Sequence, residues 1–151
     1  MPRHDQAEFL EFTLKGDTDA INFCTILFGA SQVLDDLIDK DKEVTDDELI
    51  ETFWSILIDL PMNSFYRQNV DTLVPMMQVF LQDWEDATKM EKTSGGDFQN
   101  IAYVLRDTVG AIVTHVAGMV GGRVWQKAVA VSVRNHIFEE TLEDYKTGLN
   151  K

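Results

Sequence analysis

The chain has 151 residues, of which 13 are Lys or Arg and 26 are Asp or Glu, so its formal net charge at pH 7 is −13. A chain of this length can bury roughly 68–70% of its unfolded surface, which predicts a single domain, residues 1–151, with its own apolar core. Acidic residues outnumber basic residues two to one. The composition therefore argues against a nucleic-acid partner, whose phosphates need clustered Lys and Arg.

The cysteine content and the lengths of the apolar runs bear on the compartment. Cys24 is the single cysteine and lies in the apolar run 21–28, so we expect a buried thiol in a reducing, cytoplasmic environment. The N-terminal residues lack the apolar stretch of a signal peptide. The longest apolar run, 108–120, is shorter than the ~18 residues that a membrane span needs. We therefore expect no membrane partner.

Two helices are expected in the first part of the chain. The first covers about 5–15 and ends at Gly16. Asp17 or Thr18 caps the second, which runs to about Lys40. Apolar residues occupy every side of its middle part, which is typical of a helix surrounded by other helices.

A capping box marks the start of the third expected helix. Thr45 and Glu48 have the spacing at which a hydroxyl and a carboxylate bind each other's free backbone amides. The helix is expected to continue to about Leu60, with Pro61 marking its end. Asn63 then has the chemistry to cap a short helical turn.

The second half of the chain predicts three longer helices. The fourth helix covers about 71–92 and tolerates Pro75 because this proline lies near its start. A loop with a capping residue is expected at 94–97. The last two helices are expected at 98–120 and 123–146.

Small residues follow the fifth expected helix at four-residue spacing, at Gly110, Thr114 and Gly118. Such a row lets a neighbouring helix approach closely, and it is our first candidate for a homodimer contact. The sixth helix could break near Ser132 and is expected to end at Gly148. No strand alternation is visible, so the predicted fold class is all-α, a compact bundle of about six helices. The expected core includes the following aromatic and methionine residues: Trp54, Trp84, Trp125, Phe80, Met76, Met77 and Met119.

Three carboxylates gather near the end of the second expected helix. At about 100° per residue, Asp35, Asp36 and Asp39 lie within an arc of about 100°. A helix C-terminus disfavours negative charge, which points to a bound cation, and Mg²⁺ binds one or two carboxylates while leaving positions for substrate phosphates. The alternative is a solvated helix end at which Lys40 and Lys42 reduce the repulsion.

The segment Asp35-Asp36-Leu37-Ile38-Asp39 resembles the DDxxD motif of class I isoprenoid synthases. The resemblance implies that Asp35 and Asp39 bind Mg²⁺ against an allylic diphosphate and that Asp36 is a supporting acid. It covers about 10 residues. Members of that family are about twice as long and carry a second Asp-rich motif, for which the segment 83–86 and the acids from 139 to 144 are only partial counterparts.

The chain also resembles, more weakly, the all-α nucleoside triphosphate pyrophosphohydrolases, which pair ExxE on one helix with ExxD on the next and bind Mg²⁺ with the four carboxylates. This resemblance implies the same chemistry, magnesium-assisted reaction at a diphosphate. Two sets of residues fit the spacing with Asp in place of one Glu: Glu8, Glu11, Asp36 and Asp39, and Glu48, Glu51, Asp83 and Asp86.

Diphosphate binding also requires cations. The candidates are Arg67, Arg106, Arg123 and Lys127, because guanidinium groups grip phosphate oxygens in pairs. Arg106 precedes Asp107 in an apolar helix, where a charge needs a partner. We leave two interpretations open for Arg106, a phosphate contact and a salt bridge to a neighbouring helix.

A second acidic group lies on the last expected helix. His136 and Glu140 are four residues apart, as are Glu140 and Asp144, so they could form a ligand set or a solvated acidic stripe. His115, which shares a helix face with Asp107, is expected to be a core histidine that donates to a neighbour. The secondary acidic candidates are Asp83, Asp86, His136, Glu139, Glu140 and Asp144.

Two hypotheses of different classes follow. In the first, an all-helical protein binds Mg²⁺ at Asp35, Asp36 and Asp39 and binds or acts on a diphosphate-bearing small molecule. In the second, a non-catalytic helical bundle works by association, as a homodimer or an accessory protein. Whether the protein is an enzyme stays open. A large exposed apolar patch would favour the second hypothesis.

Overall fold

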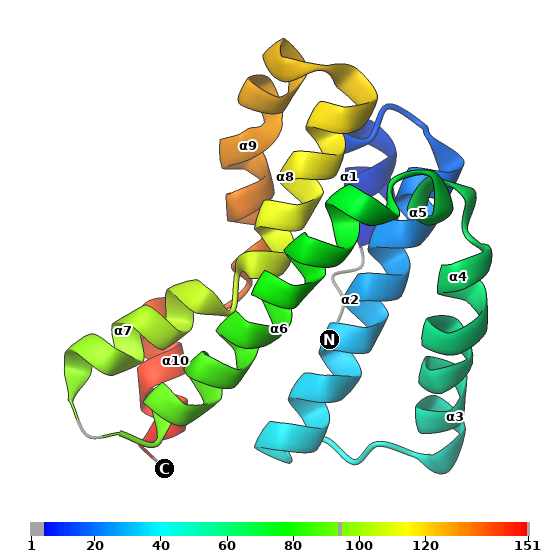
Figure 1. Ribbon diagram of the computed structural model, residues 1–151. Coiled ribbons are helices and arrows are strands. Elements are labelled where there is room, and N and C mark those ends of the chain that lie inside the picture. Colours follow the sequence, from blue (N-terminus) through cyan, green and yellow to red (C-terminus); the bar gives the residue numbers. More distant parts are fainter. Residues whose placement is uncertain (1–4, 94, 151) are drawn as a thin grey trace. The chain divides into compact units, whose positions relative to one another are not determined.

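A computed structural model describes residues 5–93 and 95–150. It is 83% helical, with no strand among the described residues, so the all-α prediction is confirmed. The chain divides into two compact units, residues 1–70 and 71–151. The prediction of one domain stays a prediction, because two compact units are compatible with one domain or with two. Figure 1 labels the helices of both units.

The helices of the first unit begin at the capping residues that the sequence predicts. The Asp17 carboxylate accepts a hydrogen bond of 3.0 Å from the Ala20 amide, and the Asn63 side chain accepts one of 2.8 Å from the Tyr66 amide. The chain leaves the first helix through a left-handed Gly16, φ +73°. The elements are α1 (Gln6–Thr13), α2 (Thr18–Asp39), α3 (Asp46–Trp54), the π-helical turn η1 (Ser55–Asp59), α4 (Leu60–Met62) and α5 (Ser64–Gln68).

The third helix begins as predicted and ends later than predicted. Thr45 and Glu48 form both bonds of the capping box. The helical path then continues through η1 and α4 to Met62, so Pro61 lies inside the last turn and does not end the helix. A proline ring clashes with the carbonyl four residues earlier in an α-helix. Here the preceding turn is π-helical, so the regular α geometry that produces this clash is absent.

The core of the first unit lies against the first half of α2, so the expectation that other helices surround the middle of this helix is wrong. Phe23 is fully buried, and its ring centroid lies 5.9 Å from Phe65 and 6.1 Å from Tyr66. Cys24 is 1% exposed, and burial raises the pKa of its thiol to about 12, so the predicted buried thiol is confirmed.

Among the described residues, one helix, α2, is long and apolar enough to cross a membrane by length and composition alone. Core helices of soluble proteins pass the same test.

The described residues of the second unit form five helices, and two of the predicted boundaries are wrong. The predicted helix 98–120 is two helices, interrupted at Arg106 and Asp107, and the predicted helix 123–146 is interrupted between Phe138 and Thr141, not near Ser132. The helices are α6 (Val70–Glu91), α7 (Gly96–Leu105), α8 (Thr108–Gly121), α9 (Arg123–Ile137) and α10 (Leu142–Leu149).

Local side-chain bonds explain these two interruptions. At the start of α8 the Thr108 hydroxyl, which has one proton to donate, lies 2.8 Å from the Leu105 carbonyl and 2.5 Å from the Asp83 carboxylate. Thr141 accepts a bond of 3.1 Å from the Asp144 amide and so caps α10. Side chains that bind nearby backbone compete with a continuous helix.

Two smaller expectations concern helix ends. Gly148 lies inside α10 and does not end it; Asn150 is the residue that follows the last turn. In the loop expected at 94–97, Ser94 lies outside the described residues. Gly95 has φ +130°, and α7 begins directly after it.

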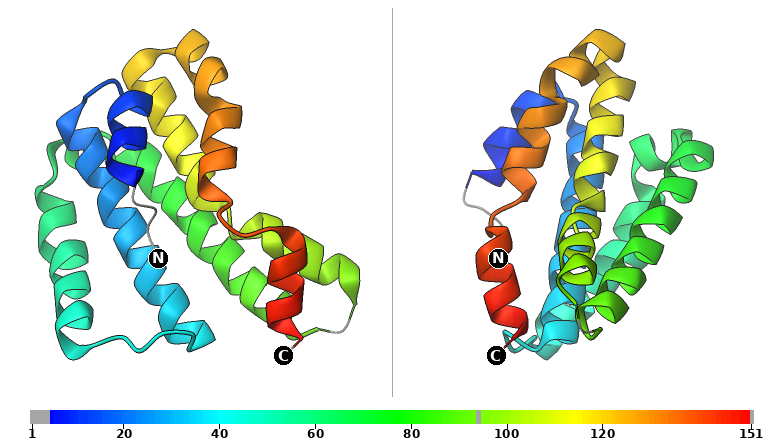
Figure 2. Two further views of the ribbon diagram at one scale, coloured as in Figure 1. Left: turned by 180° about the vertical axis from the view of Figure 1, so that it is seen from behind. Right: turned by 90° about the vertical axis from the view of Figure 1, so that its left-hand side faces the viewer.

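The glycines of α8 bring α9 of the same unit close. A Cβ atom at Gly110 would lie 3.2 Å from Cγ1 of Ile137, and one at Gly118 would lie 2.9 Å from Cδ of Gln126. Both views in Figure 2 show α8 and α9 side by side and antiparallel. The row of small residues is therefore used within the chain, and α9 occupies the face that we had selected for a homodimer contact.

A buried carboxylate marks the junction between α7 and α8. Asp107 is 2% exposed, and its Oδ2 accepts a hydrogen bond from the half-exposed Arg134 of α9. Its Oδ1 has no hydrogen-bond partner among the described residues. Burial raises the pKa of Asp107, and Arg134 only partly offsets this increase.

We predict that Arg134→Met lowers the free energy of unfolding by about 1–3 kcal/mol at pH 8, because it leaves a buried carboxylate without its donor. An acid whose pKa is raised in the folded state contributes stability at low pH, and this contribution is lost as the pH rises through the folded-state pKa. Without Arg134 this pKa rises further. The loss measured by urea unfolding should therefore shrink at pH 4.5.

The double variant Arg134→Met/Asp107→Asn is the matched control, because its amide needs no cation. It should recover much of the lost stability at pH 8. An equal loss in the single variant at both pH values, with no recovery in the double variant, would contradict this role of Asp107.

Candidate functional site

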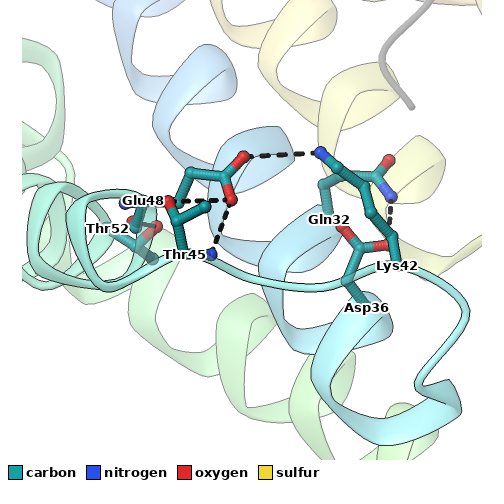
Figure 3. A network of polar contacts seen from close by, with 6 residues as sticks. All are labelled: Gln32, Asp36, Lys42, Thr45, Glu48 and Thr52. Carbon is teal, nitrogen blue, oxygen red and sulfur yellow. Dashed lines mark hydrogen bonds and ion pairs between the residues drawn. The ribbon is translucent and has the colours of Figure 1, made fainter.

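The predicted metal-binding carboxylates lie in the last two turns of α2. Asp35 and Asp36 are half-buried and Asp39 is exposed. Oδ1 of Asp36 accepts a hydrogen bond of 3.3 Å from the Gln32 amide, whereas Lys42 pairs with Glu48 at 3.4 Å (Figure 3). Lys42 thus binds the capping box of α3 in this structure.

These carboxylates do not form a ready-made metal centre. Within residues 5–93 and 95–150, no group of three or more His, Cys, Asp or Glu side chains is placed to hold a metal ion. The backbone closes α2 at Lys40, whose amide donates to the Asp36 carbonyl at 3.0 Å. Magnesium binding by Asp35, Asp36 and Asp39 therefore stays a prediction, and an ion would have to gather the three side chains.

A thermal melt with Mg²⁺ and pyrophosphate, at matched ionic strength, tests this prediction. If the three aspartates hold the ion, ligand at 100 times its Kd should stabilise the native chain by about 2.7 kcal/mol, and Asp35→Asn/Asp39→Asn should abolish this stabilisation. The variant alone should melt slightly higher without metal, because it removes charge from a helix C-terminus. Equal melting temperatures of the native chain with and without the ligands would contradict the prediction.

Arg106, a predicted phosphate ligand, is used in a cluster of the second unit. Its Nε donates to Oε1 of Glu91, and its Nη2 donates to Oε2 at 2.7 Å; both side chains are largely buried. The Tyr145 hydroxyl donates to the same carboxylate, and the guanidinium carbon lies 5.0 Å from the Trp84 ring centroid. Of our two interpretations of Arg106, a phosphate contact and a salt bridge to a neighbouring helix, the structure shows the salt bridge.

This cluster ties α6, α7 and α10 together. Burial is the larger cause of the raised pKa of Tyr145, and the neighbouring Glu91 carboxylate is the second cause.

We predict that Glu91→Gln costs about 3 kcal/mol of unfolding free energy, because it leaves Arg106 buried without an anion. Tyr145→Phe should cost only about 1 kcal/mol. Urea unfolding measures both, and equal costs would contradict a central role for the Glu91 carboxylate.

The other predicted phosphate ligands and two of the acids lie on several different helices. Arg123 donates to Gln126 at 3.2 Å, and Lys127 is exposed one turn further along α9. Arg67 is exposed in α5, in the first unit. On α6, Asp83 accepts from Thr108 and Asp86 accepts from Gln82 at 3.0 Å.

The acidic group expected on the last helix is divided by the loop between α9 and α10. His136 lies on α9 and Asp144 on α10, whereas Glu139 and Glu140 lie in the connection. The expectation that they share one helix face is therefore wrong. The Glu140 carbonyl instead accepts a bond of 2.6 Å from the Tyr103 hydroxyl.

The expected bond from His115 is not found at its Nε2 atom. The residue is half-buried in α8, and Nε2 has no hydrogen-bond partner among the described residues.

Of the aromatic residues expected in the core, Phe80 and Trp84 are buried, at 6% and 8% exposure, whereas Trp54 is 57% exposed. The expectation for Trp54 is wrong, and this error leads to a surface that sequence reasoning missed.

The helical segment from α3 to η1 exposes a row of large apolar side chains. Ile50, Phe53, Trp54 and Leu57 are 63%, 56%, 57% and 63% exposed. We call these four residues the apolar stripe. Their i, i+3, i+4, i+7 spacing is the pattern of an amphipathic helix whose apolar face is covered by another element. No residue of α3 or η1 is fully buried.

The face of this segment that its own unit partly covers is the one opposite the apolar stripe. Thr52 and Ser55 point away from the apolar stripe at about 100° per residue, and both are half-buried. α3 and η1 contact α2, which lies beside them in Figure 1. Leu49 is half-buried as well, so the covered face is mixed while the four large apolar side chains of the stripe are exposed. The spacing that indicated the stripe was visible in the sequence.

Negative charge borders the apolar stripe on one side. The first 70 residues contain 15 acidic and 5 basic residues, which is a net charge of −10 out of −13 for the chain. At about 100° per residue, Asp47 and Glu51 border the stripe along one edge, and both are exposed. The surface is therefore apolar along its middle and acidic on one side.

No protein-family profile, no curated protein and no solved structure matches this chain.

Proposed function

We propose that this protein works by association, and that a helical partner docks on the apolar stripe of α3 and η1. The observation that supports the proposal is the outward orientation of Ile50, Phe53, Trp54 and Leu57, each more than half exposed at helical spacing. Single exposed apolar residues are common on protein surfaces, whereas a contiguous row of them marks an interaction site.

The energetics favour a covered stripe. Complete burial of a side chain such as Leu or Phe is worth about 1.5–3 kcal/mol relative to full exposure. Tryptophan is among the residues that most often dominate binding energy, and Trp54 lies beside Phe53 in the middle of the stripe. Rows with this spacing are the standard contact of one helix with another.

The magnesium and diphosphate hypothesis has less support from the geometry. Its carboxylates are not gathered among the described residues, and Arg106 binds Glu91. Association therefore accounts for more of what the structure contains, and the metal hypothesis stays open to the thermal melt described above.

Site-specific photo-crosslinking tests the proposed function. A benzophenone amino acid replaces Trp54 in one variant and Leu81, a residue of α6 with 56% exposure, in the control. We expect a discrete crosslinked species from position 54 in cells that express the protein, and none from position 81. The species should disappear when Phe53→Ser and Leu57→Ser are added. No species from position 54, or the same species from both positions, would contradict the proposal.

A further inference from the structure

We infer that the occupant of the apolar stripe is a second copy of this chain, and that the second copy docks there through the outer face of its α9. This inference rests on the proposed function and adds the identity of the partner and of its contacting helix.

The outer face of α9 carries exposed apolar side chains at helical spacing. Val124 and Val131 are 84% and 72% exposed, and Ala128 between them is also exposed. At about 100° per residue these three residues lie within an arc of about 60°. The opposite face is already used, because Val129 and Val133 are buried. The helix thus has two apolar faces and covers only one of them within the described chain.

The two faces have complementary charge. α9 contains no Asp or Glu, and Arg123 and Lys127 are exposed along one edge of its outer face. The apolar stripe has Asp47 and Glu51 along one edge. When each helix is viewed from its N-terminus, the acidic edge lies on one side of the stripe and the basic edge lies on the other side of the outer face of α9. Two such faces bring the acidic and basic edges together when the helices run parallel, as the flanking charges of a parallel coiled coil do.

A contact between two stripes is disfavoured by the same charges. Residues 41–60 contain seven acidic residues and one lysine, so a stripe facing its own copy brings two strongly negative segments together. Like charges placed opposite each other across an interface suppress that pairing. The basic edge of α9 removes this repulsion at the contact, and repulsion between more distant charges is screened beyond about 8 Å at physiological salt.

A twofold dimer would contain this contact twice. The stripe of one copy would bind α9 of the other, and the reverse contact would follow from the symmetry. A single contact between two short helices is smaller than the roughly 800 Å² per partner of a standard stable interface, and two such contacts bring the buried area toward that size.

Sedimentation equilibrium of the full chain, from about 1 to 200 μM, tests the inference. We expect a concentration-dependent dimer. Phe53→Ser and Val131→Asp should each weaken it by at least about 30-fold, as removal of a central contact does. Leu81→Ser is the control, since Leu81 has the same 56% exposure as Phe53 and lies on neither face. Slow labelling of the buried Cys24 by a thiol reagent confirms that the first unit of the Phe53→Ser chain remains folded. Cooperative urea unfolding with the native midpoint confirms the same for Val131→Asp and Leu81→Ser in the second unit.

Mixing the two variants identifies which faces meet. The Phe53→Ser chain retains an intact α9 and the Val131→Asp chain retains an intact stripe, so a mixed dimer has one of its two contacts intact. An equal mixture should therefore associate more strongly than either variant alone at the same total concentration. A mixture that is no stronger than the single variants would overturn the α9-to-stripe contact.

Charge reversal tests the complementarity. Lys127→Glu should weaken the dimer by about threefold to tenfold, because it places an acid opposite an acidic edge in both contacts. Adding Glu51→Lys should restore most of the affinity. A Lys127→Glu dimer of unchanged affinity would overturn the charge argument.

The outcomes separate this inference from the proposed function. A chain that stays monomeric at every concentration, yet crosslinks to another protein from position 54, overturns the second copy and keeps the stripe as a docking surface. A dimer that Phe53→Ser disrupts and Val131→Asp does not keeps the second copy and the stripe but overturns α9 as the contacting helix. A monomer with no crosslink from position 54 overturns both.

Discussion

The arrangement of the second unit depends on one buried carboxylate. Asp107 lies where α7 ends and α8 begins, is 2% exposed, and accepts a hydrogen bond from Arg134 of α9. A buried carboxylate needs such a donor, because desolvation disfavours its charge. The requirement connects the start of α8 to the last turn of α9. Gly110 is the residue that makes room for it, since a Cβ atom there would lie 2.7 Å from Oδ1 of Asp107.

In the second unit a charged group is buried, whereas in the first unit large apolar side chains are exposed. Its α3 segment turns Thr52 and Ser55 toward the rest of the unit and leaves Phe53 and Trp54 exposed. Water solvates exposed apolar surface unfavourably, so such an orientation is typical of surfaces that a partner covers. The charge distribution of the chain is consistent with this view, because most of the net negative charge lies in the unit that carries the apolar stripe.

Helix starts were well predicted wherever a side chain caps the helix by accepting a hydrogen bond from a backbone amide nearby in the sequence. Asp17, Thr45 and Asn63 all cap the helices that follow them, because the acceptor and the amide are three residues apart in the sequence. Thr141 carries a similar signal, with Asp144 three residues on, and attention to it would have located the break before α10. The break at Asp107 could not be read in this way, because its partner Arg134 is 27 residues distant.

The candidate site shows the same division. The amino-acid sequence alone determined the all-helical class, most of the helix starts, the buried thiol of Cys24 and the concentration of negative charge in the first 70 residues, because these follow from composition, periodicity and short-range bonds. Only the tertiary structure decided that Arg106 binds Glu91, that the glycines of α8 face α9, and that Trp54 lies at the surface. Helical periodicity shows that a helix has an apolar face, but the direction of that face depends on which helices pack around it.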